Sequence, residues 1–179
     1  MLAMLDLRHE AARYRLGVLD TESLVRIADA LLKEGRNSTA AVQLLLLESP
    51  VVAEAAPIFE RMYAECGITV PTKDEAIDDL LRFHLTSITS EARPPREALH
   101  VLMKEVYFPY ISNEPTRKYF GDSRDLEQLI GAYWGYDDLQ DRPREVSFEG
   151  RHGAEAIALY DEHVRELARD WLQRHGRAE

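Results

Sequence analysis

The residues best suited to chemistry begin with Glu97 and His100, whose three-residue spacing puts a carboxylate and an imidazole on one face of a helix. Di-metal helical bundles use two such pairs together with two further glutamates. The last predicted helix offers no matching pair, because the position three before His163 is Tyr160. We therefore expect Glu97 and His100 to form a surface or boundary pair, and we predict no metal site and no cofactor.

Two further side chains invite a catalytic interpretation. His84 shares helical spacing with Leu80 and Ile88, which is typical of a histidine at the edge of a core, and a catalytic histidine oriented by a nearby acid is the alternative. Cys66 is the single cysteine, which excludes an internal disulfide and a cysteine-based zinc site, and it is typical of a small buried apolar residue. No Ser-His-Asp or Cys-His arrangement and no phosphate-binding glycine loop emerges, so we predict no catalytic residue.

Aromatic residues are densest between positions 107 and 136, which hold 8 of the chain's 15. Helical spacing assigns Tyr107, Tyr133 and Trp134 to the core. The remaining rings are expected at helix ends or in loops, where aromatic side chains wall pockets or anchor interfaces. We predict a partner-binding surface made of these rings and the acids that follow them: Tyr110, Tyr119, Tyr136, Asp137, Asp138 and Asp141.

An alternative hypothesis is a helical enzyme or small-molecule-binding protein with a pocket between neighbouring helices, lined by His100, Tyr107, Tyr110 and Trp134. A deep cavity with His100 pointing into it would favour this hypothesis, and a filled core with His100 outside would count against it. A third hypothesis is a helical homo-oligomer, which an exposed apolar patch related by two-fold symmetry would support.

The charge of the chain is negative and unevenly distributed. The formal net charge of −10 argues against nucleic acid as a direct partner. Residues 54–79 hold seven acids against two bases, residues 122–145 hold seven against three, and residues 80–121 hold four against six. Such acidic segments are solvated faces, or they steer a basic protein partner. The function that we predict is therefore binding of another protein, for example as an inhibitor or immunity protein for a basic partner.

The composition is typical of a globular protein, with 179 residues, 45% hydrophobic and 30% charged. No apolar run approaches the ~20 residues that a membrane helix needs. The N-terminal residues turn charged at Asp6, which is not typical of a signal peptide, and one cysteine fits a reducing compartment. We therefore expect a cytoplasmic protein with no membrane partner.

Helical periodicity dominates the chain, because apolar residues recur at i, i+3, i+4 and i+7 in most segments. The pattern predicts an all-α fold, a single-domain bundle of seven or eight helices that pack mostly as antiparallel neighbours over residues 1–173. A frayed tail is expected over residues 174–179, and a short extended segment is expected near residues 145–149. Thr72 and Glu75 form a capping box that should begin one of the helices.

Three local features complete these expectations. The apolar run Leu44–Leu47 predicts a central helix covered on most sides. Ser49 and Pro50 are expected to cap and begin the next helix. Residues 110–120 and 137–153 are expected to form long irregular loops, with Gly135 ending the helix before the second loop.

Overall fold

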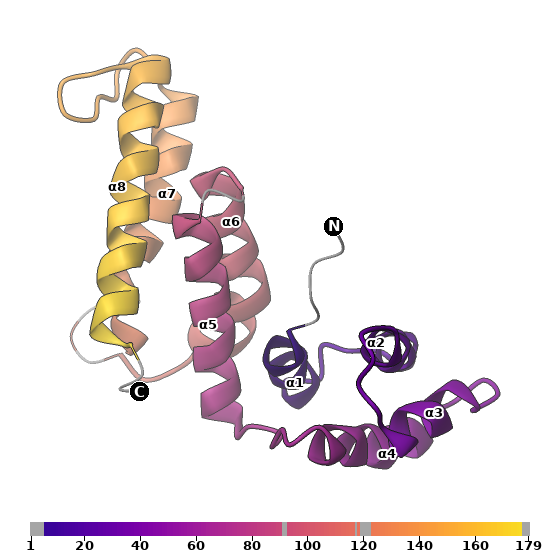
Figure 1. Ribbon diagram of the computed structural model, residues 1–179. Helices are drawn as coiled ribbons and strands as arrows, with labels where there is room; N and C mark the ends of the chain where they lie inside the picture. Colours follow the sequence, from indigo (N-terminus) through magenta and orange to yellow (C-terminus); the bar gives the residue numbers. More distant parts are fainter. Residues whose placement is uncertain (1–5, 91–92, 117, 119–122, 177–179) are drawn as a thin grey trace. The chain divides into compact units, whose positions relative to one another are not determined.

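The structure is a computed structural model that describes residues 6–90, 93–116, 118 and 123–176 (Figure 1). The described residues are 71% helical and form eight α-helices, one π-helix and one 3-10 turn, with no strand. The predicted all-α fold of seven or eight helices is confirmed. No helix within this described part of the chain is long and apolar enough to cross a membrane.

The chain divides into two compact units, Met1–Leu80 (unit 1) and Leu81–Glu179 (unit 2). The boundary falls within α5 (Lys73–Thr89), which begins at the predicted capping box. There the backbone N–H of Thr72 donates to Glu75 at 2.8 Å, and the backbone N–H of Glu75 donates to the Thr72 hydroxyl at 3.3 Å. The expected single domain over residues 1–173 stays a prediction.

Unit 1 packs its helices around an apolar core that includes Leu24, Leu31, Phe59 and Tyr63, each at most 1% exposed. Burial of such a side chain contributes roughly 1.5–3 kcal/mol. The short third helix packs against both the second and the fourth. The four helices that precede α5 are α1 (Leu7–Arg15), α2 (Thr21–Lys33), α3 (Thr39–Leu45) and α4 (Val52–Glu65).

The apolar run after Val42 is not a covered central helix, and that prediction is wrong. Leu44 is fully buried, but Leu46 is 75% exposed, because α3 ends at Leu45 and the rest of the run enters the connection to α4. The predicted cap at Ser49 is also wrong: Ser49 adopts a φ of 50° and α4 begins at Val52. The exposed aliphatic side chains around this connection are Val42, Leu45, Leu46, Val51 and Val52.

Unit 2 contains the rest of α5 and a set of helices in which α7 and α8 lie side by side (Figure 1). Pro95 occupies the first turn of the sixth helix, where its missing N–H leaves no hydrogen bond unmade. Trp171 donates its indole N–H to the Arg124 carbonyl at 2.9 Å and so fastens the last helix to the turn before α7. The elements are α6 (Pro95–Leu102), η1 (Met103–Ile111), η2 (Ser123–Asp125), α7 (Glu127–Asp141) and α8 (Gly153–Arg174).

The element η1 is a π-helix that continues directly from α6 and contains Pro109. A proline ring collides with the carbonyl four residues earlier in an α-helix, and the wider π turn accommodates it. The N–H of Ser112 donates to the Tyr107 carbonyl, five residues back, at 2.9 Å. Tyr110 therefore lies in the last turn of a helix, which corrects the predicted start of a loop at residue 110.

Helix α7 runs through Gly135 to Asp141, so the predicted break at Gly135 is wrong. A Cβ atom at Gly135 would collide with the Tyr160 side chain, which shows that this glycine serves close packing of α8 and not helix termination. The extension carries Tyr136 into the core, at 1% exposure. The predicted loop over 137–153 shrinks to residues 142–152, whose one β-like pairing joins Phe148 and Arg151.

Candidate functional site

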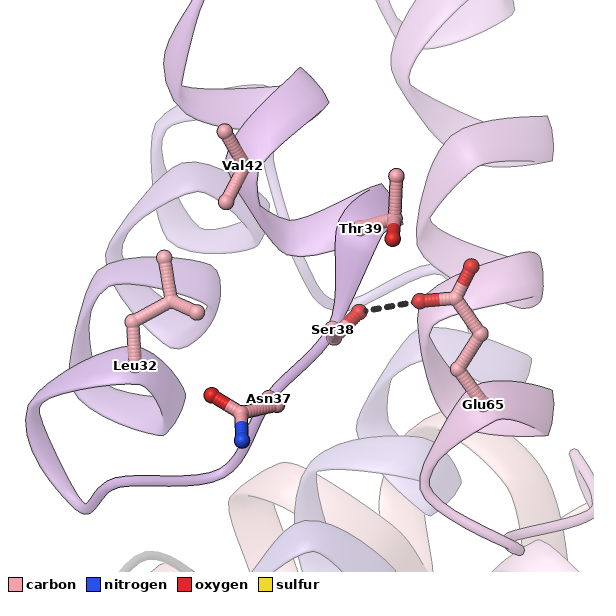
Figure 2. Close-up of a pocket in the computed structure, with 6 residues that line it drawn as sticks. All are labelled: Leu32, Asn37, Ser38, Thr39, Val42 and Glu65. Carbon is pink, nitrogen blue, oxygen red and sulfur yellow. Dashed lines mark hydrogen bonds between the residues drawn. The ribbon is translucent and has the colours of Figure 1, made fainter.

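One hollow of about 720 Å³ lies at the N-terminal end of α3 in unit 1 (Figure 2). The Ser38 hydroxyl points at Glu65 and donates to its Oε2 at 2.7 Å, while Ser38 Oγ accepts from the Ala41 N–H at 3.0 Å. Leu32 and Val42 lie on the side away from Glu65 (Figure 2). The hollow is lined by Leu32, Asn37, Ser38, Thr39, Val42 and Glu65.

Two of the polar groups of this hollow, the Ser38 hydroxyl and the Glu65 carboxylate, are engaged in helix capping. Glu65 Oε2 also accepts from the Ala40 N–H at 3.1 Å, so the carboxylate and the Ser38 hydroxyl together satisfy the first N–H groups of α3. The hydrogen bond from Ser38, and then the one from Ala40, lowers the pKa of Glu65 below its usual value. This arrangement stabilises α3 and engages the Ser38 hydroxyl and Glu65 Oε2.

A second hollow, here called the α6–α7 groove, lies between these two helices of unit 2 and has a volume of about 370 Å³. On the α6 side, residues at helical spacing of three and four share one face. On the α7 side, Tyr133 and Asp137 are one turn apart. The groove is lined by Arg96, Glu97, His100, Val101, Tyr133 and Asp137.

Two contacts cross the groove. His100 Nδ1 lies 3.2 Å from the Tyr133 hydroxyl, and the two rings are stacked with an interplanar angle of 30°. The Arg96 guanidinium reaches Asp137 Oδ1 at 3.5 Å, with side chains 43% and 53% exposed. A long and exposed ion pair of this kind contributes about 0–1 kcal/mol. Glu97, on the same wall as Arg96, forms no ion pair with any described residue.

Aromatic surface continues beyond the groove. The Tyr133 ring contacts Trp134 at 5.0 Å between centroids and Phe108 at 6.5 Å. Phe108 is 44% exposed and Trp134 is 51% exposed, although both are large apolar side chains. Exposed rings beside polar groups are the kind of surface that anchors protein interfaces.

Acids continue along α7 from the groove, and the segment Asp137–Asp141 is here called the acidic end of α7. Tyr133, Asp137 and Asp141 recur every fourth residue and share one helix face. Asp138 forms an ion pair with Arg142, whereas Asp141 has no ion-pair partner among the residues that the structure describes. The last turn of α7 contains no basic residue, although a helix C-terminus favours cations over anions.

The groove brings together residues that the sequence assigned to two different hypotheses. His100 came from the predicted small-molecule pocket and Asp137 from the predicted partner surface. Trp134, expected in the core, lies exposed beside them. The role of these residues as a site stays a prediction.

Other predicted site residues lie elsewhere. Tyr107 is 2% exposed and Tyr136 is 1% exposed, so both belong to the core. Tyr110 is half-buried in the last turn of η1. Tyr119 lies outside the described residues.

Tyr136 is an internal anchor between α7 and α8. Its hydroxyl donates to Asp161 Oδ1 at 2.6 Å, and its ring meets the Tyr160 ring edge-on at 4.8 Å. Burial, and then the hydrogen bond to Asp161, raises the pKa of the Tyr136 phenol. The Tyr136 ring and hydroxyl are thus both used inside unit 2, and the expected role of this residue in binding a partner stays a prediction.

Sequence reasoning missed the groove residues Arg96, Val101 and Tyr133 as site residues. The signal was present: Arg96 and His100 are four apart, as are Tyr133 and Asp137. The assumed helix break at Gly135 hid the second pair, because it placed Asp137 in a loop.

His84 and Cys66, the two residues considered for catalysis, are both at least half-buried. His84 is 5% exposed, with Nε2 3.4 Å from the Glu105 carboxylate of η1. Cys66 is half-buried at the end of α4, and burial raises the pKa of its thiol, which disfavours the reactive thiolate. Neither residue lies in the α6–α7 groove.

Across residues 6–176, apart from the positions that the structure leaves undescribed, no group of three or more His, Cys, Asp or Glu side chains is placed to hold a metal ion. Comparison with known proteins gives no relative: no family model matches the chain, and neither a curated protein nor a solved structure matches it.

Proposed function

We propose that the protein binds a basic segment of another protein at the α6–α7 groove and the acidic end of α7. The observation that carries this proposal is the coincidence of exposed aromatic rings and incompletely paired carboxylates on one surface. Phe108 and Trp134 supply exposed apolar area, and Glu97 and Asp141 supply carboxylates without an ion-pair partner among the described residues. Aromatic anchors surrounded by a polar rim are the usual anatomy of a protein-binding surface.

The local charge favours a cationic partner. Within the groove, Glu97 and Asp137 outnumber Arg96, which leaves a net charge of −1 with His100 neutral. Asp141 adds a further negative charge one turn along α7, while Asp138 is compensated by Arg142. This field attracts a basic segment during encounter, and association should therefore slow as salt increases.

The dipole of α7 also favours a cationic partner. The unpaired carbonyl groups at a helix C-terminus carry partial negative charge, so acids placed there raise the free energy of the unbound protein. A bound cation would relieve that repulsion. One form of this function is an inhibitor or immunity protein that covers a basic partner.

The test is capture of partners from native cells with a matched pair of charge variants. Asp137→Lys/Asp141→Lys reverses two acids four residues apart on α7, and Glu166→Lys/Asp170→Lys reverses two exposed acids four residues apart on α8. Each replacement changes the charge by two, so both variants shift the net charge from −10 to −6. Captured proteins are identified by mass spectrometry, and the association rate of each is measured at low and high salt.

The proposal expects a stoichiometric basic protein that is captured by the wild-type chain and by the α8 variant but lost from the α7 variant. Its association rate should fall with salt for the wild-type chain. Equal capture by the two variants, or no protein that distinguishes them, contradicts the proposal.

A second candidate function is binding of a small molecule in the same groove. Its volume of about 370 Å³ falls within the range of about 300–1,000 Å³ that is typical of ligand sites. The His100–Tyr133 contact would supply one donor and one acceptor for orientation. A thermal-shift screen of small molecules checks this, because a true ligand should stabilise the wild-type chain and not the Tyr133→Ala variant.

A further inference from the structure

We propose that the α6–α7 groove binds the guanidinium group of an arginine side chain from the partner, which displaces the protein's own Arg96. This inference rests on the proposed function and names the group that the groove recognises. The partner residue would lie between the Glu97 carboxylate of α6 and the Asp137 carboxylate of α7.

The protein's own Arg96 indicates which chemistry the groove accepts. Its guanidinium already spans from α6 to Asp137 on α7, so an arginine head group fits the space between the helices. At 3.5 Å this contact is longer than the 2.7–2.9 Å of a strong charge-assisted hydrogen bond. Arg96 projects from the groove wall and serves Asp137 through this one long contact.

The groove supplies each contact that an arginine side chain requires. Glu97 and Asp137 stand on opposite walls, and a guanidinium has five N–H donors in a flat fork that can serve both. The Tyr133 ring offers an aromatic surface for a cation. Val101 offers apolar surface for the methylene stem, which long cationic side chains bury while their charge stays hydrated.

Other ligand classes fit less well. An anion would face Glu97 and Asp137 within the same 370 Å³ and would be repelled by both. A lysine ammonium is a compact and strongly hydrated charge that cannot serve two separated carboxylates with a planar fork. The groove's net charge is −1 with Arg96 in place and −2 when Arg96 withdraws, and the incoming guanidinium that displaces Arg96 returns it to −1.

The test uses the full chain and a defined probe. Amide spectra of the isotope-labelled protein are recorded during titration with N-acetyl-L-arginine methylamide, and in parallel with the citrulline analogue, which has a similar shape but no charge. We expect saturable shifts at α6 and α7 with a millimolar dissociation constant for the arginine probe. The citrulline probe should give no saturable shift.

Three variants separate recognition from general attraction to an acidic protein. Asp137→Asn should weaken binding of the arginine probe by about threefold to fivefold, because one exposed ion pair is lost. Arg96→Ala should tighten binding by up to about fivefold, because the internal competitor is removed. Asp170→Asn, on an exposed part of α8, should leave the affinity unchanged.

The gain in affinity for Arg96→Ala is the decisive outcome, since loss of a merely structural side chain would not tighten binding. The inference is overturned if Arg96→Ala binds the probe more weakly or equally, or if Asp170→Asn weakens binding as much as Asp137→Asn. It is also overturned if the wild-type chain shows no saturable shift, and capture of a basic partner that depends on Asp137 would then leave the proposed function standing. Binding of the arginine probe with no captured partner would leave the arginine site standing and would contradict the proposed function.

Discussion

The hollow at the start of α3 and the α6–α7 groove are both concave and both carry acidic residues, yet they differ in how their polar groups are used. In unit 1, the Ser38 hydroxyl both donates and accepts a hydrogen bond, and the Glu65 carboxylate accepts from the backbone as well. In unit 2, the Arg96–Asp137 contact is long and exposed, and Glu97 has no ion-pair partner among the described residues.

The difference shows that volume alone does not locate a binding site. The unit 1 hollow is the larger, at about 720 Å³ against 370 Å³, but its Ser38 hydroxyl and its Glu65 carboxylate are used to begin a helix. A ligand that took these two groups would have to break capping bonds that stabilise α3. A ligand in the α6–α7 groove would replace one weak contact and gain two carboxylates.

The largest expected effect concerns the wall of the groove. Gly135→Ala should destabilise the protein by roughly 1–3 kcal/mol, because the new Cβ would collide with the Tyr160 side chain, which is packed against Tyr136 and Phe148. Gly131→Ala, one turn earlier in α7, meets no atom within 4 Å and should stabilise by about 0.5–1 kcal/mol through helix propensity. Urea unfolding of the two variants measures both effects.

These two alanine variants test the contrast between the unit 1 hollow and the α6–α7 groove. A rigid groove requires that α8 hold α7 in place. Equal stability for the two alanine variants would show that the Gly135–Tyr160 packing is absent. The α7 wall would then lack the support that the groove needs, and the distinction between the two hollows would weaken.

A smaller effect is expected from the polar groups themselves. Ser38→Ala should cost about 1 kcal/mol of unfolding free energy, because it removes the cap of α3 and one partner of Glu65. Arg96→Ala should change stability by less than about 0.5 kcal/mol, since its contact is exposed. If Arg96→Ala proves as destabilising as Ser38→Ala, the groove is a structural feature like the unit 1 hollow.

The smallest effect is a dependence of stability on pH at the unit 1 hollow. The folded state lowers the pKa of Glu65, mainly through the Ser38 hydroxyl. The contribution of Glu65 to stability is therefore present above its unfolded pKa of about 4.3. It is lost as pH falls through the lower pKa of the folded state. The stability difference between the wild-type chain and Ser38→Ala should shrink on acidification below pH ~4.3. Urea unfolding between pH 7 and pH 3 would contradict this if the difference stayed constant.

Much of the fold could be predicted because capping chemistry is local. The Thr72–Glu75 box, Asp20, Ser38 and Pro95 all begin helices through bonds or geometry within a few residues. The prediction failed at the Leu44–Leu47 run because an apolar run does not show how many residues remain helical. It also failed at Ser49, whose sequence suits a cap although the chain there adopts another conformation.

The candidate site was harder to predict because it depends on contacts between helices. Gly135 has the composition of a helix terminus, and only the approach of Tyr160 explains why α7 continues through it. The continuation of α7 through Gly135 decided whether Tyr136 and Asp137 belonged to a loop or to different faces of a helix. The π-helix at Pro109 also hid the position of Tyr110. Proline is expected at helix ends, so the sequence placed Tyr110 in a loop.

The acids at the end of α7 carry a consequence for engineering this protein. A screen for heat-resistant variants should enrich for lysine or arginine at Asp141, since a base there suits the helix terminus. The same replacement would remove a carboxylate from the proposed binding surface. Selection for heat resistance alone would therefore be expected to erode recognition first at this position, and sequences of selected variants would identify the surface without knowledge of the partner.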